Sequence, residues 1–210
     1  MKTKIILQRH GQSEGNARRI YLGHTDLGLT DEGYMQAQIT AEYLKDERID
    51  AVYSSDLIRA FKTAEPHAEL RGLEVERCEG LREMFVGDWE GLSADYLIDN
   101  FHEEFTVRRC QRDFVYPNGE SVPHAAQRMK EQILKIAKKN EGKTVLIVSH
   151  SAVIRAFWYY LCGYSELDMT ERVPFMKNGA FCILEYLDGS LAPIEYGIDS
   201  HLPKSKVNPI

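Results

Sequence analysis

Residues 3–10 have the sequence TKIILQRH, and this stretch decides the fold prediction. Its apolar residues follow one another without polar alternation, as in a strand that is buried on both faces, and the run ends at Gly11. Two further runs of the same kind are AVYSS at 51–55 and KTVLIVS at 143–149. Strands of this type are typical of parallel sheets that are covered by helices on both faces.

Segments with helical spacing alternate with these strands. Thr30 is expected to cap a helix over about 31–47, and Asp56 is expected to cap a helix over 57–70. The pattern also predicts helices over 120–140 and 152–161, two short helices within 96–112, and antiparallel edge strands at GAFCILEY (179–186) and LAPIEYG (191–197). This order predicts an α/β fold, a three-layer sandwich with a largely parallel central sheet and helices on both faces.

The composition excludes several classes of protein. Hydrophobic residues make up 43% of the chain and charged residues 28%, and no stretch approaches the ~20 apolar residues of a membrane span. Disordered, fibrous and membrane-spanning classes are therefore excluded, and no membrane partner is expected. The net charge of -6 argues against a nucleic-acid partner, because such binding depends on Lys and Arg.

Length and cysteine usage set two further expectations. The 210 residues exceed the ~100–150 of a typical domain, and we expect residues 1–210 to form a single large domain or one domain with an insertion. The four cysteines form no CxxC pair, and the N-terminus lacks the pattern of a signal peptide. We therefore expect reduced thiols in a cytoplasmic protein, at Cys78, Cys110, Cys162 and Cys182.

Charged residues lie at the carboxyl ends of the predicted parallel strands. Arg9 and His10 end the first strand, and His150 follows the third. In open α/β sheets, ligands bind just outside these strand ends, and Arg59, in the first turn of the second helix, is expected at the same crevice. Four cationic or potentially cationic groups in one crevice require an anion, so the sequence predicts a phosphate or carboxylate site.

Six short blocks of sequence carry a family pattern. The first is RHGQSEGN at 9–16. The others are GHTDLGLTDEGYMQA (23–37), YSSDLIRAFKTA (53–64), LREMFVGDWEGLS (81–93), PNGES (117–121) and VSHSAVIRAF (148–157). In order and spacing, these blocks resemble the histidine phosphatase superfamily, also called the phosphoglycerate mutase-like family, over almost the whole chain. The resemblance implies that family's fold, with a small helical cap inserted at about 93–121.

The resemblance also implies roles for individual residues. His10 would attack phosphorus and become a phosphohistidine, and Glu83 would give a proton to the leaving oxygen. Arg9, Arg59 and His150 would hold the phosphoryl oxygens. Asn16, Leu22, Gly23 and Ser151 match substrate-binding positions, although Ser151 replaces a Gly that is usual in the family and puts the leaving-group preference in doubt. The family is metal-independent, and neither a metal nor another cofactor is expected.

The chemistry of phosphoryl transfer gives these residue types a physical reason. The transition state is loose and spreads charge over the equatorial oxygens, so positioned cations supply most of the stabilisation. Arginine suits this task because it binds phosphate bidentately. His10 must be neutral to attack, and we expect Arg9 and Arg59 to lower its pKa. Its second ring nitrogen should carry the proton and be held by an acceptor.

The block at 81–93 and the short cap resemble the small phosphatase branch of the superfamily. We therefore expect a phosphomonoesterase that hydrolyses a small phosphorylated metabolite. A phosphoglycerate mutase, and α-ribazole phosphatase as the specific activity, remain alternatives. A weakly active phosphate-binding or protein-binding module is a reading from a different class.

The sequence leaves open the roles of four residues and the oligomeric state. Arg108, Arg109 and Arg112 could face a second phosphate or balance the acidic residues of the cap. Glu120 is favoured first as a residue at a helix N-terminus, with a substrate role as the alternative. A homodimer is compatible with a chain of this size, but no interface can be identified from the sequence.

Overall fold

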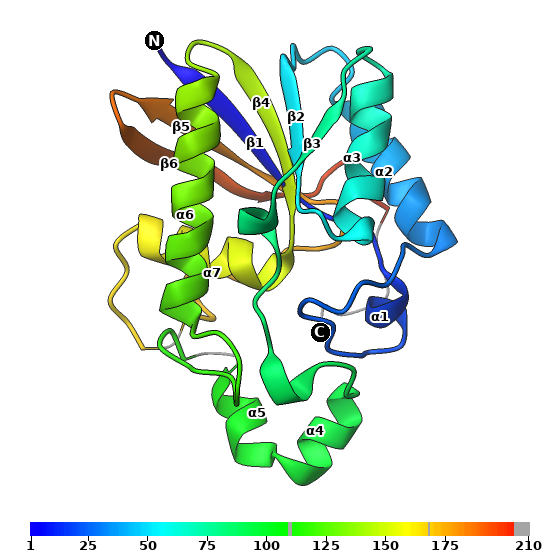
Figure 1. Cartoon of the computed structure of the whole chain (residues 1–210), viewed down its shortest axis with the longest axis vertical. Coiled ribbons are helices and arrows are strands. Elements are labelled where there is room, and N and C mark those ends of the chain that lie inside the picture. Colours follow the sequence, from blue (N-terminus) through cyan, green and yellow to red (C-terminus); the bar gives the residue numbers. More distant parts are fainter. Residues whose placement is uncertain (109–110, 168, 204–210) are drawn as a thin grey trace.

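A six-stranded sheet forms the centre of the protein in a computed structural model that describes residues 1–108, 111–167 and 169–203 (Figure 1). Its strands are β1 (Thr3–Arg9), β2 (Ala51–Ser54), β3 (Val75–Arg77), β4 (Thr144–Ser149), β5 (Phe181–Leu187) and β6 (Ser190–Ile198). They lie in the order β3-β2-β4-β1-β5-β6, parallel from β3 to β1 and antiparallel at β5 and β6. The largely parallel sheet is therefore confirmed.

Helices cover both faces of this sheet. The helices α2 (Asp31–Tyr43) and α3 (Ile58–Glu69) lie on one face, and α6 (Val122–Lys139) and α7 (Ser151–Leu161) lie on the other (Figure 1). In β1, Ile6 packs in the same core cluster as residues of α3, whereas Ile5 and Leu7 pack with residues of α6 and α7. The three-layer sandwich is confirmed, and it explains why the strands are apolar on both faces.

The shorter elements lie between β1 and α6 in the chain. They are α1 (Glu14–Ala17), the 3₁₀ turns η1 (Glu79–Leu81) and η2 (Gly87–Trp89), α4 (Ala94–Asn100) and α5 (His102–Arg108). The sequence pattern does not predict α1 or β3, because elements of four and three residues are too short to show a period. The longer helices agree with the prediction to within a few residues at their ends.

Two helix starts show how local chemistry sets the boundaries. Thr30 caps α2 as predicted, since its hydroxyl accepts a hydrogen bond from the Gly33 N–H at 3.1 Å. The predicted cap at Asp56 is wrong: the carboxylate of Asp56 binds the guanidinium of Arg82 instead. The first N–H of α3 is taken by Asp26, whose Oδ1 accepts from Ile58 at 2.7 Å. A bidentate charge-assisted pair outcompetes a single capping bond.

The segment expected as a cap, about 93–121, lies beyond the carboxyl ends of the parallel strands (Figure 1). Aromatic packing anchors it to the preceding loop, because Trp89 is only 1% exposed and contacts several rings. The ring centroid of Trp89 lies 5.5 Å from that of Tyr116 and 6.2 Å from that of Phe105. This segment, called the cap below, therefore lies over the strand ends where the charged residues are expected.

The structure also bears on the cysteines and on membrane spans. Cys78, Cys162 and Cys182 are free thiols, and Cys110 lies outside the described residues. Burial raises the pKa of Cys182 to about 12 and that of Cys78 to about 11, which favours the protonated thiol in both cases. No helix of the described ranges is long and apolar enough to cross a membrane.

Candidate active site

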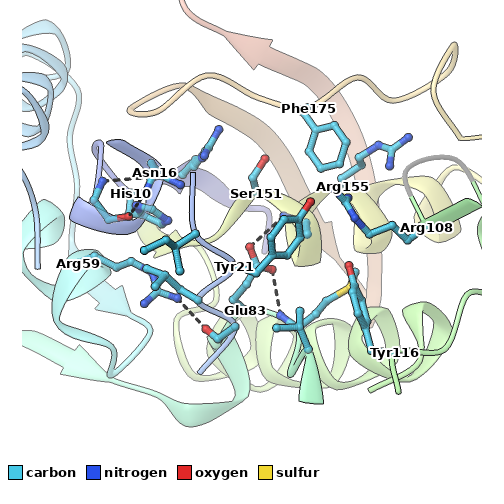
Figure 2. A pocket seen from close by; sticks show the side chains of 18 of the residues that line it. His10, Asn16, Tyr21, Arg59, Glu83, Arg108, Tyr116, Ser151, Arg155 and Phe175 are labelled. Atoms are coloured by element: carbon cyan, nitrogen blue, oxygen red, sulfur yellow. Dashed lines mark hydrogen bonds between the residues drawn. The ribbon is translucent and has the colours of Figure 1, made fainter. Parts of the chain in front are cut away.

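A pocket opens at the carboxyl ends of β1 and β4, between the sheet and the cap (Figure 2). The predicted site residues that line it are Arg9, His10, Asn16, Leu22, Gly23, Arg59, Glu83 and Ser151. His150 lies directly beside them, because its ring centroid is 5.1 Å from that of His10. The structure thus brings together all nine residues that the sequence singles out for catalysis or substrate binding.

His10 follows the last residue of β1, and its ring is held by the backbone of the next residue, Gly11. Its Nδ1 lies 2.6 Å from the carbonyl oxygen of Gly11. A carbonyl can only accept, so Nδ1 carries the proton and Nε2 keeps its lone pair. Burial lowers the pKa of His10 well below its ordinary value, and the positive charges of Arg59 and Arg9 lower it further. The ring is therefore neutral near pH 7, in the tautomer that a nucleophile at Nε2 requires.

Arg59 and His150 are held as a pair. Arg59 projects from the first turn of α3, and its Nε donates to Nδ1 of His150 at 3.2 Å. Nδ1 of His150 is thus an acceptor, which places the proton on Nε2. That Nε2 is buried and has no hydrogen-bond partner among the described residues. Burial, with the charge of Arg59 next, lowers the pKa of His150 well below its ordinary value. His150 is then a neutral donor with a free N–H.

Arg9 brings a second guanidinium to the same end of the pocket. Its Nη1 donates to the carbonyl of Met176, and its Nε is buried without a partner among the described residues. Burial lowers the pKa of Arg9 to about 10, opposed by the negative charge of Glu83. The guanidinium stays charged at neutral pH, so this end of the pocket combines two cations with an N–H donor.

The side-chain carboxylate of Glu83 lies at the N-terminus of α7. Its Oε1 accepts from the N–H groups of Met84 and Val153 at 2.9 Å, and its Oε2 accepts from the N–H of Ala152 at 3.2 Å. These contacts come from backbone rather than from Arg82, which pairs with Asp56. The carboxyl group is therefore fixed at the pocket wall by the start of α7, and no hydrogen bond from an arginine side chain reaches it within the described ranges.

The two polar substrate-binding candidates differ in how they are held. Oδ1 of Asn16 accepts from the Ser13 N–H at 3.2 Å and from Nδ2 of Asn178 at 3.0 Å, which fixes the orientation of its amide. The hydroxyl of Ser151 is buried at the first position of α7 and has no partner among the described residues. A buried hydroxyl without a partner at a pocket wall is available to a ligand.

The residues left open by the sequence fall into three groups. Arg108 lines the pocket, whereas Arg112 and Glu120 do not; Arg109 lies outside the described residues. Glu120 instead forms a bidentate pair with Arg128, with both N···O distances 2.8 Å. Arg128 also donates to the carbonyl of Glu83 at 3.2 Å, so the Glu120 pair braces the loop that carries Glu83.

Several pocket and supporting residues are missed by sequence reasoning. Tyr21, Tyr116, Arg155 and Phe175 line the end of the pocket away from His10, as Figure 2 shows. Asn178 donates to the carbonyl of His10 at 3.1 Å from 168 positions further along the chain. His24 is also missed, although its Nε2 lies 3.0 Å from the carbonyl of Glu83. No spacing pattern links such distant positions, and only the fold brings them together.

Comparisons with known proteins agree with this geometry. The family model described as "Histidine phosphatase superfamily (branch 1)" matches residues 5–198. The chain is 38% identical to "Phosphoglycerate mutase-like protein 4" of Arabidopsis thaliana, covering 96% of this chain and 88% of that protein. It is 32% identical to "Phosphoserine phosphatase 1" of Hydrogenobacter thermophilus, covering 80% of this chain and 88% of the relative.

A solved structure shows the same fold. The structure titled "Bacillus stearothermophilus YhfR" superimposes with a TM-score of 0.89 at 29% sequence identity, over 96% of this chain and 100% of that one. A family match over nearly the whole chain and a fold match over all of the solved protein lead to one conclusion. The chain belongs to the histidine phosphatase superfamily, branch 1.

Proposed function

We propose that the protein is a metal-independent phosphomonoesterase that hydrolyses a small phosphorylated metabolite through a phosphohistidine on His10. The observation that carries this proposal is the contact between Nδ1 of His10 and the carbonyl of Gly11 at 2.6 Å. It leaves Nε2 as an unprotonated nucleophile in a pocket that Arg9 and Arg59 also line. Membership of the family and similarity to a phosphoserine phosphatase support the hydrolytic reading.

The first chemical step transfers the phosphoryl group to the enzyme. Nε2 of His10 attacks phosphorus, the bond from phosphorus to the ester oxygen breaks, and Glu83 delivers a proton to the leaving oxygen. Arg9, Arg59 and the Nε2–H of His150 face the charge that spreads over the equatorial oxygens. Asn16 and Ser151 add neutral hydrogen bonds. The alcohol departs, and a phosphohistidine remains.

The second step returns the enzyme to its starting state. The Glu83 carboxylate takes a proton from a water molecule as that water attacks phosphorus. The bond from phosphorus to Nε2 breaks, inorganic phosphate leaves, and His10 regains its lone pair. Glu83 is protonated again and ready for the next ester. Acid and base are thus the same carboxyl group in opposite steps.

The leaving alcohol occupies the opposite end of the pocket in this proposal. Leu22 and Gly23 form part of the pocket wall. Tyr21, Tyr116 and Phe175 supply aromatic surface, and Tyr116 and Phe175 lie well away from His10 (Figure 2). A small organic alcohol fits a pocket with such mixed polar and apolar walls. The identity of that alcohol is decided by experiment.

The test is phosphate release from p-nitrophenyl phosphate and from a panel of sugar, glycerate, amino-acid and nucleoside monophosphates, in the presence of EDTA. We expect EDTA-resistant hydrolysis by the wild type and loss of at least ~10³-fold in His10→Ala, because the covalent route is removed. His102→Ala is the matched control, since His102 is exposed and lies on α5 outside the pocket. Equal activity of wild type and His10→Ala would contradict the proposal.

A further inference from the structure

Glu90 ties down the loop that forms one wall of the pocket. It follows the buried Trp89, and its carboxylate accepts three hydrogen bonds from residues of that loop. Oε1 accepts from the N–H of His24 at 2.7 Å, and Oε2 accepts from the N–H of Thr25 at 2.8 Å and also from the Thr25 hydroxyl. A carboxylate with this many donors fixes its partners firmly, because each bond is charge-assisted.

The same loop orients Arg59. The carbonyl of Gly23 accepts from Nη2 of Arg59, and the carbonyl of Thr25 accepts from Nη1, both at 2.8 Å. The remaining nitrogen, Nε, holds His150 at 3.2 Å. A continuous chain of contacts therefore runs from Glu90 through residues 23–25 to the guanidinium, and from there to the imidazole that faces His10.

The backbone of the loop is shaped for this contact. Gly23 has a φ of 46°, in the left-handed region, and a Cβ at this position would lie 1.9 Å from Oε1 of Glu90. Only glycine lets the loop approach the carboxylate so closely. The Glu90 charge also favours the charged form of Arg59, whose pKa is lowered mainly by burial.

We propose that Glu90 is a positioning residue, which holds Arg59 and His150 in the orientation that the phosphoryl group requires. Glu90 is not among the residues that line the pocket, so it acts through the loop. This inference rests on the proposed phosphatase function. It adds a role for the WEG segment (89–91), whose glutamate otherwise looks like an ordinary loop residue.

The first test is Glu90→Gln. Glutamine keeps the shape of the side chain, but one of its two oxygens becomes an NH₂ that cannot accept from the Thr25 or His24 N–H. We expect kcat for p-nitrophenyl phosphate to fall roughly 10- to 100-fold and KM to change less than about 3-fold, because a misaligned guanidinium weakens mainly transition-state contacts. Asp88→Asn is the control: Asp88 is exposed, lies two positions earlier and pairs with Nδ2 of Asn118.

A double-mutant cycle separates positioning from general support of the fold. If Glu90 acts through Arg59, the Glu90→Gln change should lower kcat less than about 3-fold in an Arg59→Ala background. A full 10- to 100-fold loss in that background, or a loss confined to thermal stability, would overturn the proposal. Circular dichroism melting curves identify variants that do not fold.

A measurement that does not depend on activity distinguishes the positioning role of Glu90 from the proposed phosphatase function. In the wild type, the Nε–H of Arg59 should give a protected NMR resonance, identified by its absence from Arg59→Ala, and it should become exchange-broadened in Glu90→Gln. An unchanged resonance would overturn the positioning role even in an inactive enzyme. A wild type that fails to hydrolyse any ester but shows this NMR change would contradict the proposed function alone.

Discussion

The two halves of the pocket are built differently. His10 and His150 directly follow strands β1 and β4, which pair in parallel in the middle of the sheet from Lys4 and Thr144 to Arg9 and Ser149. Arg59, Glu83 and Asn178 depend on loops: the guanidinium binds carbonyls of residues 23–25, and Glu83 lies on a segment braced by Arg128. The sheet therefore fixes the two histidines and Arg9, and the loops orient Arg59 and Glu83 beside them.

This difference implies that substitutions in the strand half and in the loop half should affect activity and folding differently. Strand ends are held by a cooperative hydrogen-bonded ladder, whereas each loop contact depends on one or two side chains. A single substitution in the loop half can therefore misplace a charge without unfolding the chain. The predictions below test that contrast.

Among substitutions in the loop half, the largest effect is expected for Arg59→Ala. It removes a cation from the phosphate end of the pocket and the hydrogen bond that orients His150. We expect kcat/KM for p-nitrophenyl phosphate to fall by roughly 10²–10³-fold, the loss typical of one transition-state donor. Arg71→Ala is a matched control, since Arg71 also donates to backbone carbonyls but follows the other end of α3. A loss of similar size in that control would show that the effect is structural.

The second effect is expected for Asn178→Ala. Asn178 joins the carbonyl of His10 to Oδ1 of Asn16, so it links the strand half of the site to the loop half. Loss of these two bonds should lower kcat/KM by about 10-fold, the value of a net hydrogen bond or two. Asn100→Ala serves as the comparison, because Asn100 is an exposed asparagine at the end of α4 that does not line the pocket. Unaltered kinetics would mean that the two halves hold their geometry independently.

The strand half was also the half that the sequence predicted best. Uninterrupted apolar runs and the charged residues after them place Arg9, His10 and His150 at one edge before any resemblance is used, and the first turn of the second predicted helix brings Arg59 to the same crevice. The assignment of Glu83 depended on the family motif, because no periodicity links 81–93 to the strand ends. The contacts of Asn178, His24 and Glu90 escaped prediction, since they join positions whose proximity exists only in the folded chain.

The mistaken cap at Asp56 has the same origin. An aspartate before a helix satisfies the local rule for an N-cap, but Arg82, 26 positions away, competes for the carboxylate with two charge-assisted bonds. Glu120 differs from Asp56, because it lies directly before the N-cap of α6, as its first interpretation predicted, and pairs with Arg128 of that same helix. Local rules fail here where a distant charge offers a stronger partner.

The third prediction concerns how kcat/KM depends on pH, because Arg59 in the loop half affects the pKa of His10 in the strand half. Burial and the charges of Arg59 and Arg9 lower the pKa of His10, so the neutral nucleophile persists below pH 6.5. The acidic limb of kcat/KM that reports His10 should therefore lie below pH 6.5. In Arg59→Met the limb should move to higher pH, because one of the lowering charges is gone while burial remains. A limb that stays in place would show that burial alone sets the pKa.

The smallest effect is expected at His67, which is buried on α3 away from the pocket. Burial, with the charges of Arg71 and His201, lowers its pKa to about 3, and neither ring nitrogen has a hydrogen-bond partner among the described residues. The unfolded chain takes up this proton near pH 6.5 and the folded chain does not, so the stability contributed by neutral His67 is present above pH 6.5 and is lost between about pH 6.5 and 3.

His67→Leu tests this contribution, because it removes the titrating group and keeps an apolar side chain in the core. The melting temperature of the wild type should fall more steeply from pH 7.5 to 4.5 than that of the variant, by roughly 2–4 °C for each kcal/mol of difference. Catalysis at pH 7.5 should not change, since His67 does not line the pocket. Parallel melting curves in both proteins would contradict this contribution and would assign the acid sensitivity to other groups with a lowered pKa, such as His10, His150 and the carboxylates of Asp56 and Glu120.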